Sequence, residues 1–386
     1  MEDRGARIDR NLALASAVVV IVIIYGSLYP FHFHSSSGDP LRALMETWRG
    51  PFGRGDFLAN ILFYFPLGLF SLQALHRWPL FARIALVMIF GCALSVSMEL
   101  IQFYDEGRAS ALSDVYANTI GVAFGSAASP IVFRGRFRWR FGIIDWRPFV
   151  ILLAGCWLGY TLFPYVPVID LHKYWEAVKP LVYSPAIPPL DAYRHTVVWL
   201  VVALLIEALT GTARSRIVLA LLVLAVLFAK ILIVDTELSR AEVLGSALAP
   251  LLWYVFLSRW RGRAALIAAL FAGVVVMDAL QPFEFSAQAR PFGWIPFRGF
   301  INGSVEQNFR SFLEKVFTYG SLTWLIARAG ARFSIAVGFS AGLVLCLRLL
   351  QVFVPGRSAE ITDVILLLIV ACAMKLMGED PKRVAA

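Results

Sequence analysis

Apolar residues run along this chain in long blocks that short polar stretches separate. Twelve of these blocks have roughly 17 to 25 residues each, the length at which an α-helix crosses a hydrocarbon layer about 30 Å thick. They cover residues 11–29, 57–75, 84–102, 113–133, 148–166, 193–210, 215–234, 241–258, 264–282, 309–327, 333–353 and 360–377. The pattern therefore predicts an all-α, polytopic membrane helix bundle of about twelve transmembrane helices.

The composition supports a membrane protein. Of the 386 residues, 59% are hydrophobic and 16% are charged, whereas a soluble domain carries about a quarter charged residues. The first apolar block follows Arg4, Arg7 and Arg10, as the core of a signal peptide would. It is longer than such a core and no clear small-residue cleavage site follows it, so we expect a retained helix.

The net charge of +9 raises the question of nucleic acid, but the distribution of basic residues indicates lipid. Lys and Arg are concentrated in the connections on the side of the N-terminus, including the run RGRFRWR at 134–140, and are scarcer in the longer connections opposite. The positive-inside bias then places both termini in the cytoplasm, at the inner membrane. We expect membrane lipids as partners and no nucleic acid.

The chain also repeats itself. A glutamine, an arginine and an aspartate follow one another at intervals of six residues at two places, Gln102, Arg108 and Asp114, and then Gln351, Arg357 and Asp363. Upstream, residues 56–70 resemble 311–325, and residues 27–33 resemble 279–285. A weaker copy lies between them, with Lys230 in the place of Gln102 and Glu242 in the place of Asp114.

These matches predict three tandem units of four helices each, called repeat 1, repeat 2 and repeat 3 below. They cover residues 11–133, 148–258 and 264–377. A unit with an even number of spans returns to its starting side, so the three copies run parallel, unlike the inverted repeats of many transporters.

Polar side chains gather around the third and fourth helices of repeat 1. Pairs three or four residues apart share a helix face, and the pairs are Asp56 with Asn60, Glu99 with Gln102, and Asp114 with Asn118. With a cytoplasmic N-terminus all six lie near the outer surface, and Arg108 lies in the turn between two of the helices. A carboxylate facing hydrocarbon costs roughly 2.5–3.5 kcal/mol, so these groups should face one another or a water-filled cleft.

Two interpretations of this cluster stay open. In the first it is a hydrogen-bonded clasp in which Arg108 pairs with Asp114 or Glu99. In the second it is a polar pocket in which Arg108 binds a phosphate or carboxylate through its bidentate guanidinium, while Glu99 or Asp114 acts as a base or acceptor.

Each repeat has a long outer connection of about 25 residues after its first helix. Trp48, Trp175 and Trp294 in these connections suit the headgroup zone of a membrane. The connections could therefore lie on the outer leaflet, or they could cover a pocket.

Other residues give weaker indications of a metal, cofactor or charge-pair site. His32, His34 and Asp39 have metal-ligand chemistry, but histidines in an interfacial loop are the commoner explanation, and we expect no metal. No cysteine pair forms C-x-x-C, and no nucleotide or phosphate-loop fingerprint is present, so we expect no cofactor. Arg348 occupies the place of Glu99 and could compensate its charge across repeats.

Glycine spacing predicts where helices pack most closely. Gly121 and Gly125 lie four residues apart on the fourth helix of repeat 1. Two glycines at this spacing remove side chains from one helix face, so a neighbouring helix can approach its backbone.

At these residues the chain resembles the VanZ-like family of bacterial membrane proteins. The matching pieces are residues 56–68 on the second helix and residues 99–121 across the third and fourth. The resemblance is best in repeat 1, and it implies an integral cytoplasmic-membrane protein with about four spans per unit. The family's namesake lowers susceptibility to the glycopeptide teicoplanin, which implies a role in the cell envelope.

Three functions then remain. The first is a non-enzymatic protein that binds an amphiphilic, lipid-linked glycan or peptidoglycan-related ligand at the outer leaflet. The second is a transporter or flippase of such an intermediate, which the repeats favour. The third is an intramembrane hydrolase or transferase that uses Glu99, Asp114 and Arg108, although the sequence assigns no nucleophile–base pair.

Overall fold

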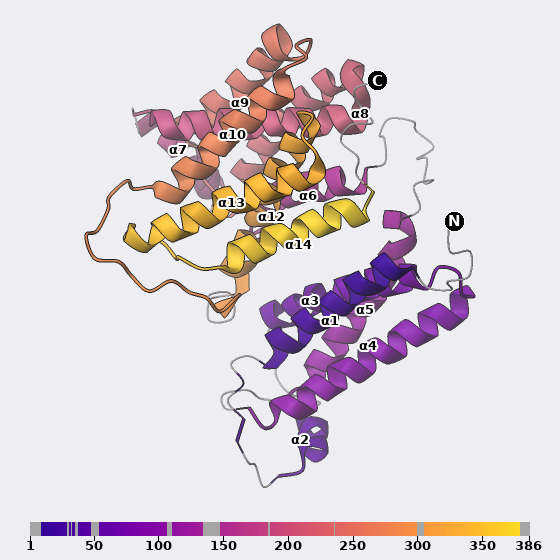
Figure 1. The fold of residues 1–386 in the computed structure, drawn as a ribbon. Helices are drawn as coiled ribbons and strands as arrows, with labels where there is room; N and C mark the ends of the chain where they lie inside the picture. Colours follow the sequence, from indigo (N-terminus) through magenta and orange to yellow (C-terminus); the bar gives the residue numbers. More distant parts are fainter. Residues whose placement is uncertain are drawn as a thin grey trace. The chain divides into compact units, whose positions relative to one another are not determined.

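In the part of the chain that it describes, the computed structural model consists of helices and their connections (Figure 1). That part comprises residues 9–28, 31, 33–34, 38–47, 54–105, 110–133, 147–183, 186–234, 236–298 and 305–378. It divides into two compact units, described separately here. The N-terminal unit holds residues 1–137 with 299–309, and the C-terminal unit holds residues 138–298 with 310–386.

In its described residues the N-terminal unit contains five complete helices and the first residues of α12 (Val305–Arg328). The five complete helices are α1 (Arg10–Leu28), α2 (Pro40–Glu46), α3 (Arg54–Ala74), α4 (Leu80–Gln102) and α5 (Leu112–Phe133). Helices α3 and α5 are in backbone contact, because glycines remove the side chains between them. A Cβ at Gly121 would lie 2.3 Å from the Ile61 carbonyl oxygen, and one at Gly125 would lie 2.0 Å from that of Phe65. The close approach that these two glycines predict is confirmed.

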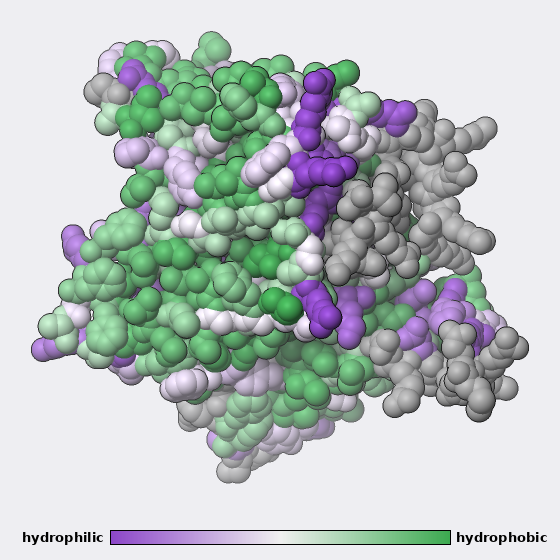
Figure 2. All heavy atoms as spheres, turned by 45° about the horizontal axis from the view of Figure 1, so that its top comes forward, coloured by the Kyte–Doolittle hydropathy of each residue, from purple (hydrophilic) through white to green (hydrophobic). Residues whose placement is uncertain are grey.

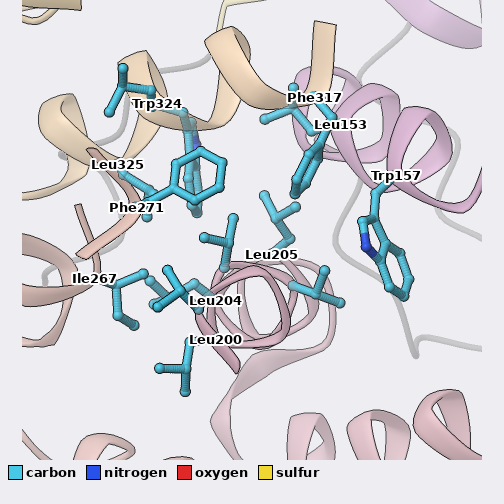
Figure 3. Packing of buried hydrophobic residues seen from close by; sticks show 14 of the residues in the cluster. Leu153, Trp157, Leu200, Leu204, Leu205, Ile267, Phe271, Phe317, Trp324 and Leu325 are labelled. Atoms are coloured by element: carbon cyan, nitrogen blue, oxygen red, sulfur yellow. The ribbon is translucent and has the colours of Figure 1, made fainter. Parts of the chain in front are cut away.

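The C-terminal unit contains the remaining helices. They are α6 (Pro148–Thr161), α7 (Leu171–Tyr183), α8 (Pro189–Leu232), α9 (Arg240–Leu252), the π-helix η2 (Trp253–Leu257), α10 (Arg263–Leu280), α12 (Val305–Arg328), α13 (Phe333–Leu350), the 3₁₀ turn η3 (Gln351–Phe353) and α14 (Thr362–Leu376). The first half of α8 is buried on all sides and forms the centre of the core. Figure 3 shows Leu204 and Leu205 of α8 facing Phe271 of α10 and Phe317 and Trp324 of α12.

All twelve apolar blocks fall on helices. Among the described residues, seven helices are long and apolar enough to cross a membrane. One of them, α8, contains two of the predicted spans, joined at Gly211, whose φ of 76° and ψ of 164° interrupt the helix. Helix α6 ends at Thr161, five residues earlier than predicted.

The helices also present apolar side chains outward, as a protein in a lipid solvent does. Figure 2 shows apolar residues over most of the visible face. Large exposed side chains such as Phe81, Phe124, Leu221 and Phe339 lie within the long apolar helices. The chain is therefore an all-α membrane protein.

One backbone turn recurs at matched positions of the three predicted repeats. An aromatic residue follows a proline with a φ of 65–66°, at Phe31, Tyr165 and Phe283, a conformation that bulky residues seldom adopt. Its amide donates to a carbonyl three residues earlier in each case, over 2.8, 3.0 and 2.7 Å. The division into three repeats stays a prediction, and these matched turns favour it.

A second backbone hydrogen bond recurs as well. It joins the residue three positions after the aromatic to the end of the third helix of the same repeat. The pairs are His34 N to Tyr104 O (2.8 Å), Val168 N to Leu232 O (2.9 Å) and Ser286 N to Phe353 O (2.7 Å). Each outer connection is thereby fixed at its start to the polar end of a transmembrane helix.

Candidate functional site

Repeat 1 contains a buried polar cluster between α3, α4 and α5. The side-chain amide of Asn118 on α5 donates to the Ser95 hydroxyl on α4 over 2.9 Å. Tyr64 of α3 lies beside Ser95 and Glu99. All of these side chains are buried, and the bond between Asn118 and Ser95 joins α5 to α4.

Glu99 connects α4 to the start of α5. Its Oε2 accepts the amide of Ala111 over 2.9 Å, and its main-chain carbonyl accepts the Ser110 hydroxyl over 2.7 Å. A carboxylate at the N-terminus of a helix is stabilised by the unpaired amides and the helix dipole there. The third and fourth helices of repeat 1 are therefore joined through an acidic cap.

Gln102 departs from the predicted arrangement, because its partner lies on α1. Its amide donates to the main-chain carbonyl of Ser27 over 2.7 Å, although its helix face suggested partners on the second and fourth helices. Gln351 of repeat 3 makes the matching bond to the carbonyl of Ala279, also over 2.7 Å. In both repeats this glutamine fixes the third helix to the end of the first.

The structure describes the other predicted site residues less fully. Asp114 lies half-buried in the first turn of α5, where the Ser113 hydroxyl is 3.4 Å from its Oδ1, and Asn60 is half-buried on α3. Arg108 lies outside the described residues, as does the side chain of Asp56. The pairing of Arg108 with Asp114 or Glu99 stays a prediction.

Repeat 2 has a salt bridge at the matching positions. Lys230 of α8 places its Nζ 2.7 Å from both carboxylate oxygens of Glu242 on α9. Both side chains are mostly buried, and His195 lies close to them. The acidic residue in the first turn of the fourth helix is thus neutralised from the third helix.

Repeat 3 neutralises its acidic residue twice. Lys315 of α12 lies 2.7 Å from Asp363 Oδ1, and Arg348 of α13 pairs with the other carboxylate oxygen. Arg348 also donates to the Tyr319 hydroxyl over 3.0 Å. Arg348 therefore has an acidic partner within its own repeat, which the expectation of a charge pair with Glu99 did not foresee.

The arginine of the motif in repeat 3 does not join this charge cluster. Arg357 donates through Nε to the main-chain carbonyl of Gln281 over 2.9 Å. The matching arginine of repeat 1, Arg108, lies outside the described residues, so the clasp interpretation of repeat 1 stays a prediction.

The outer connections cover the turns between the third and fourth helices. In repeat 1 the amide of Leu112 donates to the Thr47 hydroxyl just after α2 (3.1 Å). In repeat 2 Lys173 of α7 donates to the carbonyl of Thr236 (2.7 Å), and in repeat 3 the amide of Gly293 donates to Ala359 (2.8 Å). Trp175 and Trp294 stay exposed, and both placements of these connections, on the outer leaflet or over a pocket, stay predictions.

No metal site is found in the described part of the chain, where no three His, Cys, Asp or Glu side chains gather. Asp39 instead caps α2 by accepting the amide of Leu41 over 3.0 Å. His34 is exposed, and His32 lies outside the described residues.

The sequence interpretation also missed the ionic cluster around Arg194. Arg194 of α8 pairs with Asp278 of α10 over 3.1 Å and with Glu314 of α12 over 2.9 Å. Arg194 and Glu314 occupy the same position of their repeats, directly before the residue that matches Asn60. Opposite charges at one matched position could have predicted this pair from the sequence.

Comparison with known proteins supports the resemblance of the first repeat. Residues 12–133 match the VanZ/LLP1 family. No curated protein and no solved structure shows significant similarity to the chain. Residues 12–133, which contain α1 to α5 and the first polar cluster, are therefore a VanZ/LLP1-like domain in an all-α membrane protein.

Proposed function

We propose that the polar cluster of repeat 1 binds the headgroup of an amphiphilic ligand, of the lipid-linked glycan or peptidoglycan-related class. The protein then acts in the cell envelope as a binding protein rather than as an enzyme. The proposal depends on the outer-facing topology that the Lys and Arg distribution predicts, and on the VanZ-like character of residues 12–133.

The contrast between the repeats carries the proposal. In repeats 2 and 3 a lysine on a neighbouring helix neutralises the acid in the first turn of the fourth helix. In repeat 1 the positions of these lysines hold Gln102 and Asn60. These amides can both donate and accept hydrogen bonds, which is the chemistry that recognises hydroxyl and amide groups of a sugar or peptide.

Asn118 supplies a specific contact for such a ligand. Its side chain is 4% exposed, and its Oδ1 has no hydrogen-bond partner among the described residues. An unsatisfied buried acceptor costs about 1–3 kcal/mol, so a ligand hydroxyl or N–H that donates to this oxygen gains that amount.

A binding assay with the full-length protein tests the proposal. The purified protein is placed in liposomes containing a fluorescent polyprenyl-phosphate-linked sugar, and the wild type is compared with Asn118→Ala. Thr119→Ala is the matched control, because the Thr119 hydroxyl bonds only its own helix among the described contacts. We expect roughly tenfold weaker binding for Asn118→Ala, the loss of one buried hydrogen bond, and no change for the control.

The same assay separates the alternative functions. Transfer of the labelled lipid across the bilayer identifies a flippase, and release of the sugar identifies a hydrolase or transferase. Equal binding by the wild type and a correctly folded Asn118→Ala variant contradicts the assignment of the headgroup site.

A further inference from the structure

In the C-terminal unit, a surface groove lies between the second half of α8 and the π-helix η2. It has a volume of about 370 Å³ and is lined by Arg216, Ile217, Ala220 and Leu221 of α8 with Tyr254 of η2. Apart from the arginine, the lining is apolar. The Tyr254 hydroxyl donates to the main-chain carbonyl of Arg216, which fixes one wall of the groove against the other.

The two ends of this groove differ in chemistry. Arg216 lies at one end, and Leu221 lies five residues further along α8, about 8 Å along the helix axis. Away from Arg216, the side chains of Ile217 and Leu221 on α8 and of Phe256 on η2 are largely exposed. The groove surface itself is almost wholly apolar and suits an apolar chain, and the charge of Arg216 beside it suits an anionic group at one end of that chain.

The charge around the arginine end is strongly positive. Residues 207–216 and 254–263 contain five arginines, Arg214, Arg216, Arg259, Arg261 and Arg263, and a single acid, Glu207. Glu207 is buried and pairs with Arg263, so it does not neutralise the surface. In the described part of the chain Arg216 forms no salt bridge, and its Nη2 lies 3.5 Å from the Ser258 hydroxyl.

We propose that this groove binds one anionic phospholipid of the leaflet on the side of the basic connections. Its phosphate pairs with the Arg216 guanidinium, since Arg binds phosphate through parallel N–H donors. Its acyl chain lies along Ile217, Ala220 and Leu221. Exposed Trp260, six residues after the lining residue Tyr254 and beside Arg259 and Arg261, lies at the headgroup level, where tryptophan is enriched.

The break at Gly211 explains why the site occurs here. It ends the buried first half of α8 and starts a second helical half at the basic side. Arg214 and Arg216 lie in the first turns of this second half, close to the break. The lipid thereby covers an otherwise exposed apolar strip between α8 and η2.

Lipid titration of the full-length protein in detergent tests the proposal. Native mass spectrometry and thermal unfolding are recorded with dioleoyl phosphatidylglycerol, with dioleoyl phosphatidylcholine and with inorganic phosphate alone. We expect phosphatidylglycerol to bind and to raise Tm, while phosphatidylcholine and phosphate have much smaller effects. Equal effects of the two lipids, or full protection by phosphate alone, would overturn the proposal.

Two variants address the two ends of the groove. Arg216→Gln should weaken phosphatidylglycerol binding about fivefold, and Ala220→Trp should block the acyl chain while leaving Arg216 in place. The matched controls are Arg332→Gln, an exposed arginine preceding α13, and Leu224→Trp, an exposed position one turn beyond the groove. Unchanged binding in Ala220→Trp sinks the proposal even if Arg216→Gln fails to fold.

Discussion

Lys230 and Glu242 form a mostly buried salt bridge at the two positions where repeat 1 holds Gln102 and Asp114. The Nζ atom lies 2.7 Å from both carboxylate oxygens. The same place in the four-helix unit is thus a closed ion pair in repeat 2, a double ion pair in repeat 3 and an amide-rich cluster in repeat 1. This difference supports the proposal that repeat 1 binds the ligand.

Replacing only one partner of the salt bridge in repeat 2 should destabilise the protein more than replacing both. Lys230→Gln leaves the Glu242 carboxylate buried without its cation, a change that costs about 3–5 kcal/mol in a buried pair. Lys230→Gln combined with Glu242→Gln should recover most of this loss, because two amides can bond each other. Thermal unfolding in detergent measures both; a double variant no more stable than the single would contradict this account.

An exposed ion pair provides the control for that experiment. Lys179 and Glu176 of α7 are 2.9 Å apart and well exposed. Such pairs contribute about 0–1 kcal/mol, so Lys179→Gln should leave Tm nearly unchanged.

The acids of repeats 1 and 3 should respond differently to substitution. Asp114→Ala and Arg108→Ala are expected to abolish ligand binding while the protein remains detectable in the membrane. Asp363→Asn removes the partner of Lys315 and Arg348, so it should lower Tm with a smaller direct effect on binding, as should Arg357→Ala. Immunoblots of the membrane fraction measure the amount of each variant, and the liposome assay measures its ligand binding. If both repeat 1 variants are lost from the membrane, the cluster is a purely structural clasp.

Helix packing in the N-terminal unit depends on glycine. Gly125→Ala places a Cβ 2.0 Å from the Phe65 carbonyl oxygen, and both backbones must separate to admit it. We expect a loss of about 1–3 kcal/mol or more, as for other overpacked sites. Gly342→Ala in α13 is the matched control, because no atom lies within 4 Å of its Cβ position; a similar loss of Tm in both variants would refute the close α3–α5 contact as the cause.

Topology can be tested by labelling single cysteines with a membrane-impermeant maleimide in intact cells. In a background without Cys92, Cys156, Cys346 and Cys372, cysteines at positions 108 and 287 should react from outside. A cysteine at position 213 should react only after the cells are opened, since the basic connections are expected in the cytoplasm. Labelling at 108 only in opened cells would place the repeat 1 cluster on the wrong side for the proposed ligand.

The sequence alone determined where the helices lie, because membrane-spanning length and apolar character are local properties of a segment. All twelve apolar blocks became helices, and the spacing of Gly121 and Gly125 was sufficient to predict a close contact. Helical periodicity also placed Glu99 and Asn118 on buried faces, because it fixes which side chains point the same way.

Only the tertiary structure decided which partner each polar group bonds. Gln102 and Arg357 donate to main-chain carbonyls of Ser27 and Gln281, and every residue offers such a carbonyl, so no sequence pattern distinguishes the acceptor. The Arg194 cluster likewise depends on the rotation and depth of three helices relative to one another. Periodicity in the sequence shows on which face of its helix a side chain lies. The packing of the helices sets the distance from donor to acceptor, and that distance determines which hydrogen bonds form.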